Sequence, residues 1–227
     1  MTPQSYNSYQ YTYNLGPTKQ NRHITTSPKE IKHITVAALL IVGIGFSIGL
    51  YSSIGPLVQF FGGFPFKWTL DMMAVFAAIL TVSMLTHEFA HKIMAQKSGL
   101  WAEFRLTTWG TVLTFVSIFL PLRMIAPGAM MIAGSPDGDE LVKISVVGPV
   151  TNLLFSAVLF ASAFYFPQTG YGGMLFFAAY INAFMAVFNL LPVGILDGFK
   201  IFTFNKKVWI LAFIPAVLLA VLTYLLI

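Results

Sequence analysis

The stretch that decides the fold is residues 68–97, WTLDMMAVFAAILTVSMLTHEFAHKIMAQK. This mostly apolar run is long enough to cross a bilayer, which takes about 20 residues of helix. It carries an HExxH motif, HEFAH, at residues 87–91. On a helix, His87 and His91 share one face and can reach one metal ion, while Glu88 beside them can take a proton from a water that the metal activates. Ionisable groups at membrane depth are costly, so the motif indicates a functional site.

The composition places the chain among membrane proteins. Of its 227 residues, 57% are hydrophobic and 9% are charged, whereas soluble domains carry about 25% charged residues. The absence of cysteine excludes disulfides, thiolate metal ligands and a cysteine nucleophile. The net charge of +5 comes from basic residues beside apolar segments, where they act as topology signals rather than as a nucleic-acid surface. We therefore expect a multi-pass protein in the lipid bilayer, with no nucleic-acid partner.

The apolar runs predict an α-helical polytopic protein with about five transmembrane helices. Residues 1–33 are polar and indicate a disordered cytoplasmic tail, and residues 34–67 indicate the first transmembrane helix and an interfacial loop. The other spans are expected at residues 68–97, 141–166, 172–191 and 208–227. Three of them form a catalytic membrane core over residues 68–200, and residues 201–227 hold the C-terminal transmembrane helix.

Residues 101–136, between spans two and three, are ambiguous. Their middle, residues 110–134, is apolar enough to be taken for another span. However, residues 101–108 alternate apolar and polar side chains, which is typical of a strand. Thr, Val, Ile and Phe in the middle also favour strand, and Arg123 with several Pro and Gly residues interrupts the run. We expect membrane-associated β-strands or a hairpin, with the polar backbone groups paired.

A catalytic zinc ion usually has three protein ligands and a water. The two remaining histidines lie in the polar N-terminal segment, so a carboxylate is expected as the third ligand. Asp71 lies about 24 Å from the first motif histidine along the same helix, which is too far. Glu103 falls in the strand region, and the acidic cluster at residues 137–140 is typical of a solvated loop. Asp197 remains, in NLLPVGILDG at residues 189–198, directly after the fourth span.

Whether residues 110–134 cross the membrane decides whether these three ligands can meet. If residues 110–134 do not span, His91 and Asp197 approach the same side of the membrane; if they do span, the two end on opposite sides. Lys200 and its basic neighbours before the last span favour the first case by the positive-inside rule. We expect a cytoplasmic N-terminus and a metal about 15 Å below the cytoplasmic end of its helix, reached by water from that side.

Other polar residues in the spans leave alternatives open. Asn152 follows Gly148-Pro149 in the third span, where it can bond between helices or hold a substrate backbone or an oxyanion. Asn189 and Pro192 either end the fourth span or open it so that Asp197 is aimed at the metal.

Taken together, these motifs resemble those of the site-2 protease family, the intramembrane zinc metalloproteases of peptidase family M50. HEFAH at 87–91 is similar to the family's HExxH, GPVTN at 148–152 to its GPxxN, and NLLPVGILDG at 189–198 to its NxxPxxxLDG. Pro-Gly-Ala at 127–129 resembles a segment of the intervening strands in some members. The resemblance covers roughly residues 68–200.

The resemblance implies that His87, His91 and Asp197 bind one Zn²⁺ per chain and that Glu88 is the general base, with Asn152 a candidate substrate or oxyanion contact. The implied activity is a zinc metalloendopeptidase of a prokaryotic cell membrane. It would cut a membrane-anchored protein within or near its transmembrane helix, in regulated intramembrane proteolysis, with the substrate held as an added strand. We expect neither a PDZ nor a CBS domain among these residues.

Two other hypotheses remain. A metal-binding membrane transporter, or another non-proteolytic membrane protein, would also place histidines and acids on membrane helices. A transporter needs a polar path through both leaflets, whereas the polar residues here gather towards one side. An unrelated membrane metalloprotease would use Glu103 or Glu140 as its third ligand.

Overall fold

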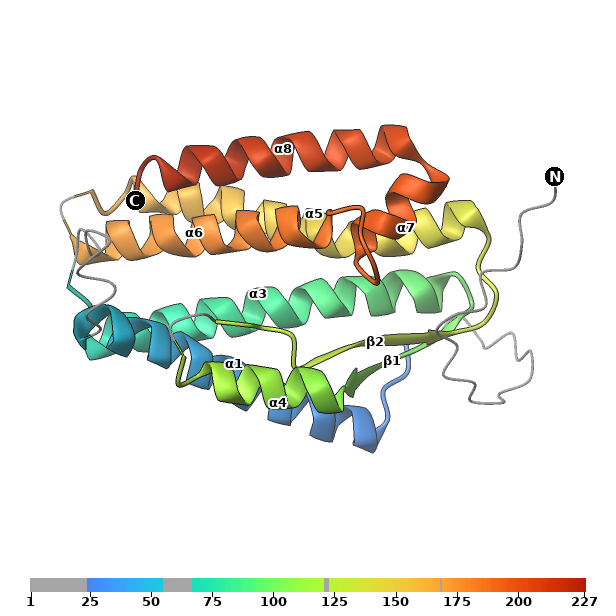
Figure 1. Ribbon diagram of the computed structural model, residues 1–227, viewed down its shortest axis with the longest axis horizontal. Helices are drawn as coiled ribbons and strands as arrows, with labels where there is room; N and C mark the ends of the chain where they lie inside the picture. Colours follow the sequence, from blue (N-terminus) through green and yellow to red (C-terminus); the bar gives the residue numbers. More distant parts are fainter. Residues whose placement is uncertain (1–23, 55–66, 121–122, 168) are drawn as a thin grey trace.

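A computed structural model describes residues 24–54, 67–120, 123–167 and 169–227. Most of the expected N-terminal tail and interfacial loop, residues 1–23 and 55–66, lies outside the described residues. Five of the described helices are long and apolar enough to cross a membrane. They are α1 (Pro28–Ile54), α3 (Leu70–Lys97), α5 (Gly138–Ala163), α6 (Gly170–Asn189) and α8 (Lys206–Tyr224) (Figure 1). The prediction of a helical multi-pass membrane protein is confirmed.

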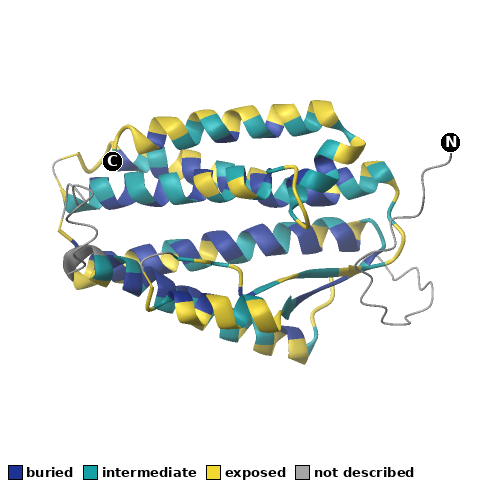
Figure 2. Ribbon diagram, viewed as in Figure 1, coloured by how far each residue is buried: buried dark blue, intermediate teal, exposed yellow. Residues whose placement is uncertain are grey.

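The long helices form one bundle in which α3 and α5 are central. Helix α3 packs against α1, α5 and α6, and α6 packs against α5 and α8. Phe76, Leu80 and Met174 are buried at the centre of the α1, α3 and α6 cluster. The outer faces carry exposed large apolar side chains, such as Leu211 and Leu218 on α8 (Figure 2). An apolar exterior around an apolar interior is what a bilayer, rather than water, stabilises.

A two-stranded antiparallel sheet stands between the second and third spans. Strand β1 (Trp101–Leu106) pairs with β2 (Gly128–Ala133), so that Trp101 lies opposite Ala133 and Leu106 opposite Gly128. Because the first residue of β1 pairs with the last of β2, the chain returns to the end of α3 from which it left. This confirms the predicted strand region, and the chain enters and leaves it at the same end of α3.

The expectation of strand throughout the middle of this region is wrong. Residues Thr108–Ser117 form helix α4, which packs against α1 and exposes Trp109 and Phe115. The β-branched residues favour strand in water, but a helix pairs its backbone groups internally while it presents apolar side chains on its exterior. The segment therefore has a short helix between its two strands (Figure 1).

The first helix begins at Pro28, within the segment expected to be a polar tail. The side chain of Glu30 is wholly buried, and its Oε2 lies 2.6 Å from Nζ of the buried Lys92 on α3. Its Oε1 accepts the N–H of Phe104 on β1 at 2.9 Å. A polar composition indicated disorder, but this carboxylate has a buried cation and a strand edge as partners, which sequence does not reveal.

Candidate metal centre

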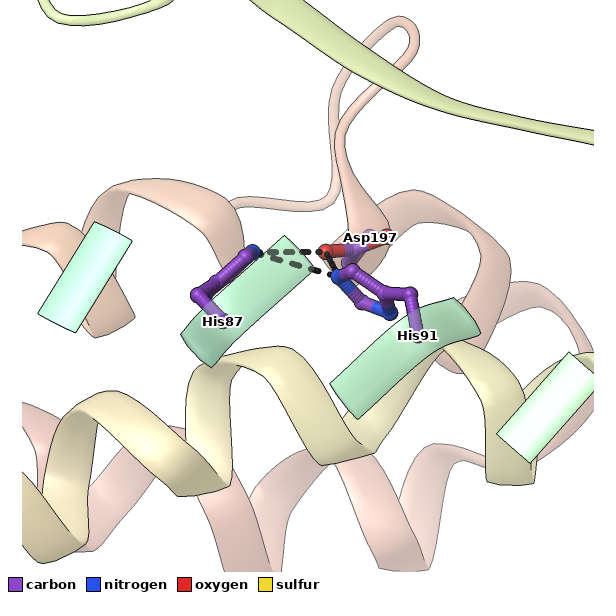
Figure 3. Close-up of side chains that lie close together, drawn as sticks. All are labelled: His87, His91 and Asp197. Atoms are coloured by element: carbon purple, nitrogen blue, oxygen red, sulfur yellow. Dashed lines mark hydrogen bonds and ion pairs between the residues drawn. The ribbon is translucent and has the colours of Figure 1, made fainter. Parts of the chain in front are cut away.

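The two motif histidines and Asp197 meet at one buried point, as expected from the sequence. His87 and His91 lie one turn apart on α3, and their Nε2 atoms are 3.1 Å apart. Asp197 is the first residue of the short helix α7 (Asp197–Phe204). Its Oδ2 lies 3.1 Å from Nε2 of His91 and 3.8 Å from Nε2 of His87 (Figure 3). The three side chains thus point inward to a common centre from two separate elements.

The outer nitrogens of both rings face oxygen atoms. Nδ1 of His91 lies 2.6 Å from the carbonyl oxygen of Ile144 on α5, and Nδ1 of His87 contacts Oδ1 of Asn152 on the same helix. A carbonyl oxygen can only accept, so each Nδ1 is the protonated nitrogen and each Nε2 of a neutral ring presents a lone pair. Histidine ligands of metals are typically oriented by such contacts at the outer nitrogen.

The donor set fits zinc. Two imidazole nitrogens and a carboxylate oxygen converge at 3.1–3.8 Å, and with both rings neutral and protonated at Nδ1 all three atoms offer lone pairs to a metal ion between them. Tetrahedral ligands about 2.0–2.1 Å from zinc would be about 3.3 Å apart. Two histidines, one carboxylate and a fourth position for water make a catalytic rather than a closed structural set. Among the described residues, these three are the group of histidine and acidic side chains placed to hold a metal.

The alternative carboxylate ligands are used elsewhere. Glu103 on β1 accepts a hydrogen bond from Ser27 and pairs with Arg105. Glu140 forms a capping box with Asp137 at the start of α5, where each side chain accepts the other residue's backbone N–H. Neither belongs to the group around the two histidines.

Gly148 gives the histidines their space. A Cβ added at this position on α5 would lie 2.3 Å from Nε2 of His91 and 2.8 Å from Cε1 of His87. Such contacts are far inside van der Waals separation, so even a methyl group would displace the rings. The missing side chain at this position therefore lets α5 approach the two rings closely.

The segment after α6 positions Asp197. A Cβ at Gly198 would lie 2.0 Å from the carbonyl oxygen of Leu190, so the glycine allows α7 to start directly against the end of α6. The same carbonyl accepts the indole N–H of Trp209 on α8 at 2.7 Å. Nζ of Lys200 lies 3.4 Å from Oδ1 of Asp197, which leaves Oδ2 turned towards the histidines.

The side chain of Glu88 extends from α3 towards the sheet. Its carboxylate is buried, and Oε2 accepts the backbone N–H of Met130 on β2 at 3.0 Å. Since Glu88 directly follows His87 in the chain, the acid links the metal-facing helix to the edge of β2.

Asn152 lies against the outer side of the His87 ring. It is fully buried; its Oδ1 contacts His87, and its Nδ2 donates to Oδ1 of Asn182 on α6 at 3.2 Å. Sequence reasoning missed Asn182. The available signal was an isolated amide within an otherwise apolar fourth span, where a polar group needs a partner.

A multi-pass helical membrane protein that gathers two histidines, an aspartate and a neighbouring glutamate has the side chains that a metal-dependent hydrolase uses. The sequence comparisons agree with this class. The family model described as "Peptidase family M50" matches residues 166–216, from just before α6 into α8.

Two curated relatives extend the match. The protein named "Putative zinc metalloprotease MJ0611", from Methanocaldococcus jannaschii, is 34% identical over 137 residues, which cover 58% of this chain and 70% of the relative. The protein named "Putative zinc metalloprotease Rip3", from Mycobacterium tuberculosis, is 28% identical over 144 residues, 60% of this chain but 32% of the relative. No solved structure matches. The chain belongs to peptidase family M50. It is a zinc metalloprotease, and it is an integral, multi-pass membrane protein.

Proposed function

We propose that this chain is an intramembrane protease that cuts membrane-anchored proteins within or near a transmembrane helix, in regulated intramembrane proteolysis. The observation that carries the proposal is the meeting of His87, His91 and Asp197 at a buried point of a bundle whose long helices are apolar enough to span a membrane. A site at this depth reaches peptide bonds that lie in or beside the bilayer. Residues 68–200 form its catalytic core.

In this proposal, His87, His91 and Asp197 hold one zinc ion. Bound zinc supplies a water whose pKa is lowered towards about 7 and polarises the scissile carbonyl. Glu88 is the general base, which takes the proton from the attacking water and gives it to the leaving amine. Its hydrogen bond from Met130 on β2 holds the carboxylate at the edge of the sheet, next to where a substrate backbone would lie.

In the two-stranded sheet, side chains of α1 occupy the outer edge of β1, whereas the outer edge of β2 faces the candidate metal centre. The outward N–H groups of Phe104 and Leu106 on β1 are bonded to the side chains of Glu30 and His33, at 2.9 and 3.2 Å. The outward N–H of Met130 on β2 points to Glu88 instead. We infer that an unwound substrate pairs as an added strand with β2, which would bring its backbone beside the general base.

A transmembrane substrate must unwind before it can pair in this way, because a helix hides its carbonyls in its own hydrogen bonds. Helix-breaking residues near the cleavage site are therefore expected in substrates. The positive-inside rule supports a cytoplasmic N-terminus, since Lys29, Lys97 and Lys206 stand at the ends of spans that would face the cytoplasm. A prokaryotic cell membrane is the proposed location.

The test is cleavage of a single-span reporter by the purified protein in proteoliposomes. Glu88→Gln keeps the size of the side chain and its acceptor for Met130 but cannot act as a base. We expect wild-type protein to cut the reporter and Glu88→Gln to lose at least about 100-fold in rate, the contribution typical of general acid–base catalysis. A Glu88→Gln protein that cuts at the wild-type rate would show that the proposed chemistry is wrong.

A further inference from the structure

A chain of hydrogen bonds crosses three helices and ends at the metal-facing ring of His87. On α6, Nδ2 of Asn182 donates to the carbonyl oxygen of Ala178 at 2.9 Å. Oδ1 of Asn182 accepts from Nδ2 of Asn152 on α5 at 3.2 Å, and Oδ1 of Asn152 contacts Nδ1 of His87 on α3. Both amides are buried, with exposed fractions of 0% for Asn152 and 1% for Asn182.

The donor and acceptor order of these hydrogen bonds is set at the end that lies on α6, at the carbonyl of Ala178. A backbone carbonyl can only accept a hydrogen bond, so the amide of Asn182 must turn its NH₂ group to Ala178 and its oxygen to Asn152. Asn152 must then present its own NH₂ group to Asn182 and its oxygen to His87. That oxygen requires a proton on Nδ1 of His87, which leaves the lone pair on Nε2, the atom that faces His91 and Asp197.

We propose that Asn182 is a positioning residue of the metal centre, which sets the amide orientation of Asn152 and thereby the tautomer of His87. The proposal rests on the proposed role of His87 as a zinc ligand. Without Asn182, the amide of Asn152 is free to rotate by half a turn and offer its NH₂ group to Nδ1. His87 would then carry its proton on Nε2, where it blocks the metal.

The α5–α6 interface offers a matched control. Oγ of the buried Ser156 on α5 donates to the carbonyl oxygen of Ala179 on α6 at 2.8 Å, one turn from Asn152. Ser156→Ala removes a hydrogen bond between the same two helices but leaves intact the hydrogen bonds that link Asn182, Asn152 and His87. A loss of interface packing alone would therefore affect both variants.

The experiment measures how fast purified, zinc-loaded protein releases zinc to a chelator. Leucine is close to asparagine in size but has no acceptor. In Asn182→Leu, Asn152 is no longer held as the acceptor for His87, so we expect zinc to be released up to about 10-fold to 100-fold faster, the range of affinity loss when a ligand loses its direct outer partner. Ser156→Ala is expected to stay near the wild-type rate. Equal rates of zinc release from Asn182→Leu and Ser156→Ala would overturn the proposal. If Asn182→Leu does not accumulate, Asn182→Ala supplies the same comparison.

A second background sharpens the test. In Asn152→Asp, both carboxylate oxygens accept, so His87 keeps its proton on Nδ1 whichever way the group is turned. Asn182 then no longer decides which atom of residue 152 faces His87, and its amide oxygen would be repelled by the carboxylate of Asp at position 152. We expect Asn182→Leu to leave zinc release unchanged or slower in this background. If Asn182→Leu speeds zinc release as much in the Asn152→Asp background as in wild type, Asn182 does not act through the amide orientation of Asn152.

The readout is zinc release, which separates this proposal from the proposed function. A wild-type protein that holds zinc but cuts no reporter would refute intramembrane proteolysis and leave the role of Asn182 standing. Wild-type zinc release and wild-type cleavage in Asn182→Leu would refute only the role of Asn182.

Discussion

Oδ2 of Asp197 lies 3.1 Å from Nε2 of His91, although β1, α4, β2, α5 and α6 all stand between the two residues in the chain. The pairing of β1 with β2 returns the chain to the end of α3. The contact of Gly198 with Leu190 then starts α7 directly at the end of α6. The metal centre is therefore a product of the tertiary fold, and its integrity depends on contacts outside the metal-facing atoms.

Gly148→Ala should disturb the metal centre without adding a polar group. Its Cβ would lie 2.3 Å from Nε2 of His91, so the ring or α5 must move. We expect a loss of thermal stability worth about 1–3 kcal/mol, as for other overpacked sites, and a loss of zinc affinity of about 10-fold or more, since ligand geometry is displaced. Zinc titration and thermal unfolding in detergent measure the two effects.

The control is Gly43→Ala, on α1. A Cβ there would lie 3.0 Å from Cδ1 of Ile118, the flexible end of a side chain remote from the histidines. Zinc affinity should be unchanged in Gly43→Ala. Equal zinc affinity in Gly148→Ala and Gly43→Ala would show that α5 does not constrain the rings.

Ile132→Pro should weaken substrate binding while zinc binding is retained. Along β2, Ile132 stands two residues from Met130, so its N–H points to the same outward edge. Proline removes that N–H and is tolerated at a strand edge. We expect a higher KM or lower kcat/KM for the reporter, with zinc content as in wild type.

Ile132→Ala keeps the N–H and removes most of the side chain, so it separates backbone pairing from side-chain contact. If Ile132→Pro and Ile132→Ala have the same kcat/KM, substrate does not pair with this edge of β2.

Lys92→Met should destabilise the protein more than the double variant Lys92→Met with Glu30→Gln. Both charged side chains are almost wholly buried, and their charged atoms are 2.6 Å apart. Removing one partner leaves a buried charge unpaired, which costs about 3–5 kcal/mol. Glu30→Gln removes the second charge and keeps an acceptor for the N–H of Phe104. Thermal unfolding of the purified proteins compares them; a double variant less stable than Lys92→Met would contradict this account.

The spans and the strand region were predictable because their signals are local. Length and hydropathy define the helices, and the alternation in Trp101–Leu106 is that of a strand. The meeting of Asp197 with the motif histidines was also predictable, because the described chain offers few carboxylates and a zinc ion needs a third ligand.

The remaining features depend on contacts that no local pattern encodes. Thr108–Ser117 has β-branched residues but forms a helix, because an apolar environment makes internal backbone pairing decisive. The composition around Glu30 predicts a polar tail, because its partner, Lys92, is distant in the sequence. Asn182 was overlooked because its role arises only when α5 and α6 bring two amides together.

The most direct test of the central claim is the zinc content of purified protein, measured by elemental analysis, in wild type, Glu88→Gln and Asp197→Ala. We expect one zinc per chain in wild type and in Glu88→Gln, and little or no zinc in Asp197→Ala, which keeps the two histidines but loses the third ligand. Full zinc occupancy in Asp197→Ala would contradict the account, because the metal would then be held by a different set of side chains.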